Sequence, residues 1–263
     1  MKAIILAAGE GKRLRPLTNN KPKCMVELFG KSLLQWQIDT FKHFGISDIS
    51  IVTGYHNKMI KLPNISYFHN EKYASTNMIE TLFCAKSKLD DSVIVSYGDI
   101  IFEKEILSKL IKSNQSISVI IDKDWKNYWN MRFQNPLDDA ESLLLDDNGF
   151  LTDIGQSVTS YEQIQGQYIG LMKFQNDGVT FLKDFYNKCK NESILSVNPL
   201  NPNLDFEKSY MTDLLRSMVI NGSKIKSIPI HNGWLELDTF DDFKLYEKKF
   251  HENTLDDIFS VSS

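Results

Sequence analysis

Five basic side chains closely follow the first apolar run of the sequence. The run Ala3–Ala8 ends at two glycines, Gly9 and Gly11, with Glu10 between them. The cations that follow are Lys12, Arg13, Arg15, Lys21 and Lys23. Glycines let a backbone approach a ligand and turn its N–H groups toward it, and several cations together can hold several phosphates. This combination predicts a site for a nucleoside triphosphate, and an ordinary solvated basic loop is the alternative.

Two other phosphate-binding motifs do not fit this segment. The dinucleotide fingerprint G-x-G-x-x-G needs a third glycine as a helix opens. Leu14 stands at that position, and Pro16 argues against an immediate helix. The P-loop sequence G-x-x-x-x-G-K-[ST] does not occur in the chain. The basic loop is therefore of a different kind.

A carboxylate follows a second buried run. Residues 92–96 read as an apolar strand, and Gly98 and Asp99 come directly after Tyr97. Ligands of open α/β sheets lie outside the carboxyl ends of the strands, so Asp99 and the basic loop are expected to face one crevice. A carboxylate beside a triphosphate is well placed to hold Mg²⁺. The alternative is an aspartate that only caps a turn.

A second pair of acids lies near the other end of the chain. Glu236 and Asp238 are two residues apart in an extended segment, so both side chains point to the same face. Such a pair can meet Asp99 across a magnesium ion. Asp238 or Thr239 could instead cap the last helix, and the two roles are compatible.

Aromatic and acidic residues gather between residues 122 and 149. The segment contains Trp125, Tyr128, Trp129 and Arg132, together with Asp122, Asp124, Asp138, Asp139 and Glu141. Aromatic faces with carboxylates suit an ammonium group, through cation–π contacts and ion pairing. Trp234 and Tyr168 could join this set. The alternative is that Trp129 and Phe133, four residues apart, pack a helix onto the body of the protein.

Strands and helices alternate along the chain. Strands are expected near residues 2–7, 48–53, 65–68, 92–96, 117–121, 150–154, 167–174 and 225–230. Helices are expected from Ser32 to Gly45, from Thr76 or Asn77 to Ala85, over 103–113, 176–189 and 206–220, and from about residue 241. This order predicts an α/β fold of Rossmann-like type, with a mixed, mainly parallel sheet flanked by helices.

The segment 122–149 interrupts this alternation and is expected to form an inserted lid. A single domain over residues 1–250 is the simplest organisation, followed by a tail over 251–263. The end of the tail, beyond about residue 256, is expected to fray.

The composition points to a protein that works on small molecules. Among 263 residues, 30 Lys plus Arg stand against 34 Asp plus Glu, a net charge of −4, which gives no general attraction to nucleic acid or to an anionic membrane. No apolar run is long enough to span a bilayer, and no signal-peptide pattern occurs. Cys24, Cys84 and Cys189 lie far apart without metal-binding spacing. A reduced, cytoplasmic protein is expected, and a homodimer is left open.

The segment from Leu6 to Lys23 resembles the signature of nucleotidyltransferases that activate sugar phosphates and small phosphorylated alcohols. It reads L-A-A-G-x-G-x-R-L-x-P-L-T-x-x-x-P-K. The resemblance implies the GT-A-like fold of these enzymes. It also implies that Arg13 and Lys12 stabilise the leaving pyrophosphate, that Lys23 sits at the α-phosphate and that Asp99 and Asp238 bind Mg²⁺. The nucleotide-binding residues implied are Leu6, Ala7, Ala8, Gly9, Gly11, Ser75, Asn77 and Gly98.

The lid is similar to that of a CTP-dependent branch of this family. Residues 122–141 read D-x-x-W-x-x-x-W-x-x-R-F-x-N-P-L-x-D-A-E, and they are followed by Q-Y-I-G-L-x-K-F and W-x-E-x-D. These motifs resemble cytidylyltransferases that activate phosphocholine, 2-aminoethylphosphonate or phosphoglutamine for the decoration of surface polysaccharides or lipids. The resemblance implies CTP and a small zwitterionic phosphate or phosphonate as substrates. The acceptor-binding residues expected are Asp122, Trp125, Trp129, Arg132, Glu141, Tyr168, Trp234 and Glu236, with Arg132 facing a carboxylate of the acceptor.

Three other functions are alternatives. A hexose-1-phosphate nucleotidyltransferase would share the basic loop, but it usually carries an E-x-P sugar loop that is missing here. A non-catalytic nucleotide-binding regulator should have lost Arg13, Lys23, Asp99 or Asp238, and all four are present. A phosphate-binding module with a basic surface would leave the W-x-E-x-D segment unexplained.

Overall fold

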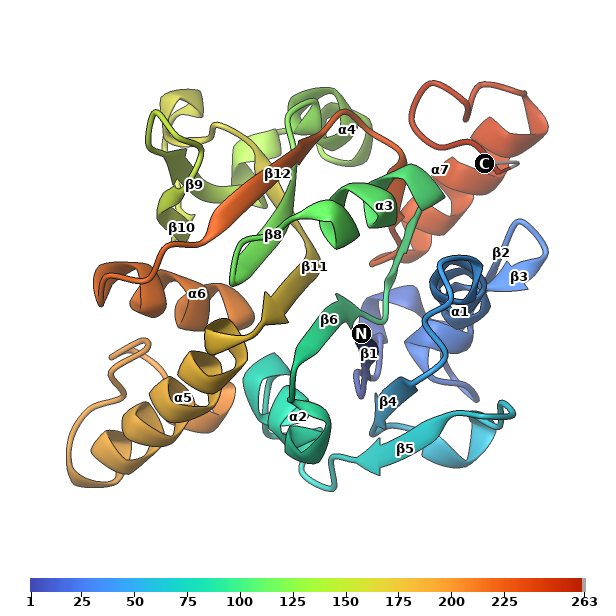
Figure 1. Cartoon of the computed structure of the whole chain (residues 1–263). Coiled ribbons are helices and arrows are strands. Elements are labelled where there is room, and N and C mark those ends of the chain that lie inside the picture. The colour runs from blue at the N-terminus through green and yellow to red at the C-terminus, as the bar shows by residue number, and fades with distance from the viewer. Residues whose placement is uncertain (262–263) are drawn as a thin grey trace.

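A seven-stranded, mainly parallel sheet forms the centre of the protein in a computed structural model that describes residues 1–261 (Figure 1). Its strands are β1 (Lys2–Ala7), β4 (Ile49–Thr53), β5 (Ser66–His69), β6 (Ser92–Tyr97), β8 (Ile117–Asp122), β11 (Gln167–Gln175) and β12 (Lys226–Ile230), in the order β12-β8-β11-β6-β1-β4-β5. Strand β11 runs antiparallel to both of its neighbours, and the other pairs are parallel. The predicted α/β fold with a mixed, mainly parallel sheet is confirmed.

Helices cover both faces of this sheet. They are α1 (Leu33–His43), α2 (Met78–Cys84), α3 (Lys104–Lys112), α4 (Trp125–Arg132), α5 (Asp177–Leu195), α6 (Met211–Ile220) and α7 (Phe240–His251). Alternate residues of β1 enter two separate cores: Ala3 and Ile5 face the core that includes α1, α3, α4 and α7, while Ile4 faces the core that includes α2, α5 and α6. Burial on both faces explains why the central strands are apolar without alternation.

Three short strand pairs complete the fold. They are β2 (Glu27–Leu28) with β3 (Lys31–Ser32), β9 (Glu141–Leu145) with β10 (Leu151–Ser157), and β7 (Ile100–Phe102) with β13 (Trp234–Glu236). In the last pair Ile100 lies opposite Glu236, so the residue before β7 and the residues after β13 are close in space. Strands β2, β3, β7, β9 and β13 are not among the predicted strands. Four of them have only two or three residues, which is too few to show a pattern, and β9 lies inside the segment that was expected to form a lid.

Several predicted boundaries are corrected. The helix expected over 206–220 is a 3-10 turn, Phe206–Lys208, followed by a separate α6 that starts after Tyr210, whose backbone N–H donates to Asp213 at 2.7 Å. The helix expected over 176–189 continues to Leu195. The expected lid segment contains α4, a 3-10 turn at Pro136–Asp138 and β9.

The expectation of a frayed end beyond residue 256 is wrong for Ile258 and Phe259. They are only 7% and 2% exposed. The carbonyl of Ile258 accepts a hydrogen bond from Gly233 N at 2.8 Å, and the Phe259 ring meets Trp36 edge-on with ring centroids 6.0 Å apart. The burial of these apolar side chains, with Phe259 against Trp36 of α1, stabilises the end of the chain. This stabilisation outweighs the tendency of chain ends to be mobile. Residues 262 and 263 of the tail lie outside the described part.

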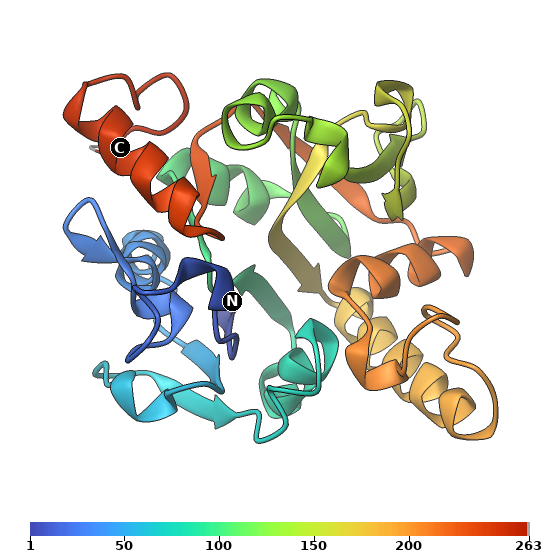
Figure 2. The same cartoon turned by 180° about the vertical axis from the view of Figure 1, so that it is seen from behind.

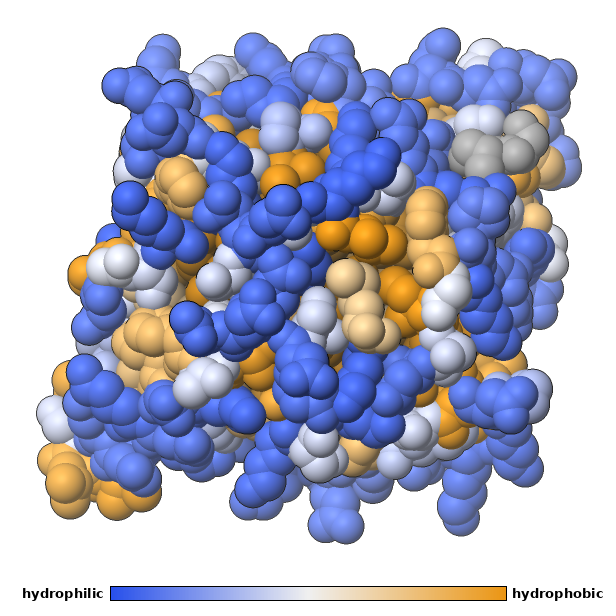
Figure 3. Space-filling view, in the orientation of Figure 1, coloured by the Kyte–Doolittle hydropathy of each residue, from blue (hydrophilic) through white to orange (hydrophobic). Residues whose placement is uncertain are grey.

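The surface in Figure 3 is largely hydrophilic. A small exposed apolar group lies at the end of α5, where Ile194, Leu195 and Val197 are 77%, 89% and 67% exposed. Within residues 1–261, none of the helices has both the length and the apolar content that a membrane crossing requires.

Candidate active site

The glycine loop begins at the carboxyl end of β1 and is held against the ends of β4 and β6. Gly98 N donates to the carbonyl of Leu6 at 2.9 Å, and Tyr55 N donates to that of Ala8 at 3.1 Å. A Cβ atom on Gly98 would lie 2.7 Å from the Leu6 carbonyl oxygen, so only glycine fits there. Gly11 has φ of +65°, a conformation that also favours glycine. Figure 2 shows this blue segment beside the red α7.

A pocket opens between this loop and the start of α2. It is lined by Leu6, Ala7, Ala8, Gly9, Lys23, Cys24, Tyr73, Thr76, Asn77, Met78, Thr81, Tyr97, Gly98 and Asp99. Six of the predicted nucleotide-binding residues are in this lining: Leu6, Ala7, Ala8, Gly9, Asn77 and Gly98. Gly11 and Ser75 are not, since Gly11 turns the loop and the exposed Ser75 donates to the carbonyl of Lys72 at 3.2 Å. Their contact with a nucleotide stays a prediction.

Lys23 bridges the two carboxylates that the sequence singled out as metal ligands. Its Nζ donates to Asp99 Oδ2 at 2.7 Å and to Asp238 Oδ1 at 2.8 Å, and its side chain is 12% exposed. Burial opposes the charged ammonium, but Asp99 and Asp238 more than offset it and raise the pKa of Lys23. The pairing of β7 with β13 therefore brings together three residues from distant parts of the chain.

The two cations predicted to hold the leaving group are placed differently. Arg13 forms an ion pair with Asp238 through Nη2 and leaves much of its side chain in solvent. Burial opposes ionisation of Asp238, yet Lys23 and Arg13 hold the pKa of this carboxyl below its ordinary value. Lys12 points away, toward Glu10, with Nζ 3.3 Å from the carboxylate. The structure brings Arg13, Lys23, Asp99 and Asp238 together, and it leaves Lys12 outside the cluster.

Asp99 and Asp238 fit a magnesium ion in their chemistry. Asp99 Oδ1 is buried and has no hydrogen-bond partner, so one oxygen is left for a cation. Residues 1–261 contain no group of three or more His, Cys, Asp or Glu that could hold a metal. Magnesium is commonly held by one or two carboxylates together with substrate phosphates, which matches two aspartates beside a phosphate-binding loop.

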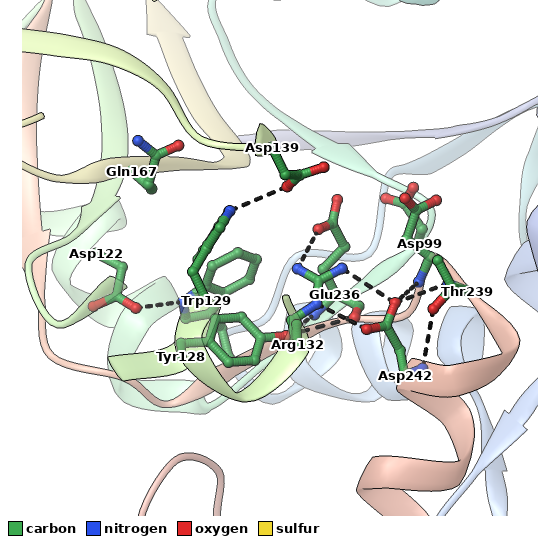
Figure 4. A network of polar contacts seen from close by, with 12 residues as sticks. Asp99, Asp122, Tyr128, Trp129, Arg132, Asp139, Gln167, Glu236, Thr239 and Asp242 are labelled. Carbon is green, nitrogen blue, oxygen red and sulfur yellow. Dashed lines mark hydrogen bonds and ion pairs between the residues drawn. The ribbon is translucent and has the colours of Figure 1, made fainter. Parts of the chain in front are cut away.

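A buried network connects the lid to Asp238 (Figure 4). Arg132 donates from Nη1 to Glu236 Oε2 at 2.8 Å and from Nε to Asp242 Oδ1 at 2.9 Å, and its side chain is 1% exposed. Asp242 Oδ2 in turn accepts from the backbone N–H groups of Asp238 and Thr239, at 3.1 and 2.8 Å. Arg132 of α4 is thus linked through Asp242 to the backbone of Asp238, a connection that the sequence did not reveal.

The aromatic residues of the lid pack inward. Trp125, Tyr128, Trp129 and Trp234 are between 1% and 5% exposed. The Tyr128 and Trp234 rings meet at 5.2 Å between centroids, and Trp129 Nε1 donates to Asp139 Oδ2 at 3.1 Å. This is the packing role that the sequence analysis gave as the alternative to binding an ammonium group. Contact of these rings with an acceptor stays a prediction.

Asp122 is the most enclosed of the predicted acceptor-binding residues. Its side chain accepts from Trp234 Nε1 at 3.0 Å and from the backbone of Asp124 at 2.9 Å, and the residue is 0% exposed. Glu141 and Tyr168 are more accessible. The Tyr168 ring lies edge-on to Tyr97 of the pocket, with centroids 5.8 Å apart. The structure therefore places Tyr168 next to the pocket and encloses Asp122 in the lid.

About half of the chain matches a known protein family. Residues 3–137 match the family model described as the MobA-like NTP transferase domain. The chain belongs to this nucleotidyltransferase family. The Lys23 cluster and the pocket lie on the part of the chain that the family model covers, except for the segment that carries Asp238.

Two curated relatives are similar in sequence. The CTP:phosphoglutamine cytidylyltransferase of Campylobacter jejuni is 36% identical over 260 residues, which cover 95% of this chain and 100% of that protein. The choline-phosphate cytidylyltransferase of Streptococcus pneumoniae is 35% identical over 133 residues, which cover 49% of this chain and 57% of that protein. The predicted resemblance to the small CTP-dependent branch is confirmed.

Solved structures share the fold. The CTP:phosphocholine cytidylyltransferase of Streptococcus pneumoniae superposes with a TM-score of 0.71 at 22% identity, over 95% of this chain and 98% of that one. The inositol-1-phosphate CTP transferase of T. maritima gives a TM-score of 0.70 at 21% identity, over 94% of this chain and 95% of that one. The fold is thus that of known nucleotidyltransferases.

Proposed function

We propose that the protein is a Mg²⁺-dependent cytidylyltransferase, which transfers CMP from CTP to a small zwitterionic phosphate or phosphonate and releases pyrophosphate. The observation that carries the proposal is the cluster in which Lys23 joins Asp99 and Asp238 at 2.7 and 2.8 Å beside the glycine-loop pocket. A cytidylyltransferase that aligns over 95% of this chain supports CTP as the nucleotide.

The residues of the cluster have separate roles in an in-line displacement. An oxygen of the acceptor phosphate attacks the α-phosphorus, and the bond from this phosphorus to the β-phosphate oxygen breaks. Lys23 neutralises charge at the α-phosphate, and Arg13 stabilises the departing pyrophosphate. Magnesium, held by Asp99 and Asp238 when bound, supplies further charge neutralisation at the phosphates. The acceptor is already an anion at neutral pH, so no side chain has to remove a proton.

The acceptor is proposed to lie between the lid and the Lys23 cluster. Arg132 is enclosed, and Glu236 and Asp242 occupy its donors, so we assign it to positioning Glu236. Glu236, Glu141 and Tyr168 are then the most accessible groups for an ammonium-bearing acceptor. Phosphoglutamine is the first candidate, because the relative that aligns over 95% of the chain is named for it.

The proposal includes the setting of the reaction. A net charge of −4 and an apolar content of 42% support an enzyme of the cytoplasm that acts on small molecules, independent of nucleic acid or membrane. The activated product would serve the decoration of a surface polysaccharide or lipid.

The test is pyrophosphate release with Mg²⁺ in a grid of nucleotides and acceptors. The nucleotides are CTP, UTP, dTTP, GTP and ATP, and the acceptors are phosphoglutamine, phosphocholine, phosphoethanolamine, 2-aminoethylphosphonate and glucose-1-phosphate. Turnover with CTP and one amine-bearing acceptor is the expected result. Turnover with glucose-1-phosphate alone would make the protein a hexose-1-phosphate nucleotidyltransferase and refute the proposal.

A further inference from the structure

A buried asparagine reaches two hydroxyl groups in the side of the pocket that α2 and the loop before it form. Asn70 is 4% exposed, and its Nδ2 lies 2.9 Å from Thr76 Oγ1 and 3.0 Å from Thr81 Oγ1. Both threonines line the pocket, whereas Asn70 stands behind them. Thr76 and Thr81 come from α2 and the loop before it, whereas the basic residues come from the loop after β1, so the two hydroxyls form a polar wall on a different element from the phosphate-binding residues.

The orientation of the Asn70 amide is fixed by its surroundings. Its Oδ1 accepts a hydrogen bond from the backbone N–H of Lys72 at 3.0 Å. A backbone N–H can only donate, so the oxygen of the amide must face Lys72 and the NH₂ group must face the two threonines. Thr76 Oγ1 and Thr81 Oγ1 therefore both act as acceptors toward Asn70.

The hydroxyl protons of the two threonines also take part in hydrogen bonds within the protein. Thr76 Oγ1 donates to the carbonyl of Lys72 at 3.0 Å, and Thr81 Oγ1 donates to the carbonyl of Asn77 at 3.1 Å. Each hydroxyl has one proton and two lone pairs, and the proton and one lone pair are now occupied. Each hydroxyl therefore keeps one lone pair, with which it can accept a hydrogen bond from a ligand but not donate one.

We propose that Asn70 holds Thr76 and Thr81 as hydrogen-bond acceptors, and that this wall selects cytosine over uracil by receiving the 4-amino group. This inference rests on the proposed function, since it concerns the base of the same nucleotide. Cytosine presents an N4 amino group with two donors, whereas uracil presents an O4 acceptor at the same place. Uracil would set its O4 against oxygen lone pairs and leave the hydroxyls unpaired, which opposes its binding.

The first experiment removes the donor from the ligand. Wild-type protein is titrated by calorimetry with CTP, with UTP and with the triphosphate of the 2-pyrimidinone riboside, which lacks the 4-amino group. CTP is expected to bind roughly tenfold or more tightly than either analogue, the size of effect that one unmade hydrogen bond at a polar site gives. Equal binding of CTP and the pyrimidinone analogue would overturn the proposal without any variant.

The second experiment removes the acceptors from the protein. Thr76→Val and Thr81→Val, singly and together, are expected to lower the affinity for CTP. The affinity for the pyrimidinone analogue should stay within about threefold of the wild-type value, so the preference for CTP over this analogue is lost. Thr76→Ser and Thr81→Ser keep the hydroxyl and are expected to keep the preference. Thr53→Val is the matched control, because Thr53 is a similarly buried threonine outside the pocket lining, whose hydroxyl donates to the carbonyl of Phe68 at 3.0 Å.

The outcomes separate this inference from the proposed function. If wild-type protein turns over CTP but the valine variants retain the preference, the hydroxyl wall is refuted and the cytidylyltransferase proposal stands. The wall is also refuted if the serine and valine variants behave alike. If wild-type protein turns over UTP and not CTP, both proposals fail.

Discussion

The glycine loop and the lid use the same kinds of residue in opposite ways. In the loop after β1, the side chains of Arg13 and Lys12 are 65% and 72% exposed. In the lid, Arg132 is 1% exposed and the tryptophans of α4 are packed inside. The loop rests on a large sheet that is already covered by helices, so the side chains of Arg13 and Lys12 are not needed to fill a core.

The lid helix α4 packs into a main core of the protein, since Trp125, Tyr128 and Trp129 belong to the core that includes α1, α3 and α7. The lid lies between β8 and β11 and is attached to the body through α4, where Tyr128 donates to or accepts from Tyr246 of α7 at 2.5 Å. Aromatic residues that would suit a ligand are equally suited to this packing. A motif of charged residues on a strand-end loop therefore predicts function more directly than a motif of aromatic residues in an insertion. This difference predicts that variants in the loop change chemistry, and that variants in the lid change stability.

The largest effect is expected at the two aspartates. Asp99→Ala and Asp238→Ala should each lower kcat by at least about a thousandfold, because a carboxylate that holds the metal is lost. Pyrophosphate release measures this, and thermal denaturation should show a folded protein. Asp241→Ala is the control, since Asp241 is exposed near Asp238 and pairs only with Lys244 at the surface. Full activity in either variant would contradict the metal assignment.

The next effect is expected in the lid and on stability. Arg132→Ala leaves Asp242, which is 4% exposed, without its cation and should lower the free energy of unfolding by about 3–5 kcal/mol. Denaturant titration measures this. Arg216→Ala, which breaks a partly exposed pair with Asp153, should cost far less.

The same Arg132 variant also tests the contrast between the glycine loop and the lid. If Arg132→Ala unfolds at the same denaturant concentration as wild type while the KM for the acceptor rises strongly, Arg132 binds the acceptor directly, as the sequence suggested. The contrast between loop and lid would then not hold for this residue.

A smaller effect is expected at Arg13. Arg13→Ala should lower kcat about a hundredfold with little change in the KM of the acceptor, because a preorganised cation at the leaving group is lost. Lys12→Ala should change kcat only a few-fold, since Lys12 faces Glu10. Steady-state kinetics on both variants measures the difference, and equal losses would place Lys12 in the reaction as well.

The smallest effect is expected from a conservative change in the lid. Trp129→Phe keeps a ring in the core but removes the hydrogen bond to Asp139. If Trp129 helps to shape the acceptor site, the KM for the acceptor should rise a few-fold while that for CTP stays the same. A parallel rise of both constants would mean that the ring only packs the lid.

The sequence predicted the parts of the site that depend on local order. The glycine loop, Lys23 and Asp99 follow directly from buried strands, and the rule that ligands lie at the carboxyl ends of those strands put them together. The helix starts at Ser32 and Asn77 were likewise expected, and both side chains accept the capping hydrogen bonds. Local motifs were sufficient for these features.

The features that the sequence did not reveal depend on contacts between distant segments. The pairing of β7 with β13 is one, because a three-residue strand carries little pattern of its own. The hydroxyls held by Asn70 are another, since their protons are assigned only when all partners are known. The inward packing of Trp125 is a third, because composition cannot tell a ring that meets a ligand from one that meets other rings.

The distance along the chain between Lys23 and Asp238 has a consequence for the growing polypeptide. Lys23 and Asp238 are 215 positions apart, and chains are made and fold from the N-terminus onward. A nascent chain that has reached β8 already carries the glycine loop, Lys23 and Asp99, but its second aspartate has not been synthesised. Strand β11, which lies between β6 and β8 in the sheet, is also missing from such a chain. The cluster around Lys23 is therefore completed only when β13 and the residues that follow it have been synthesised.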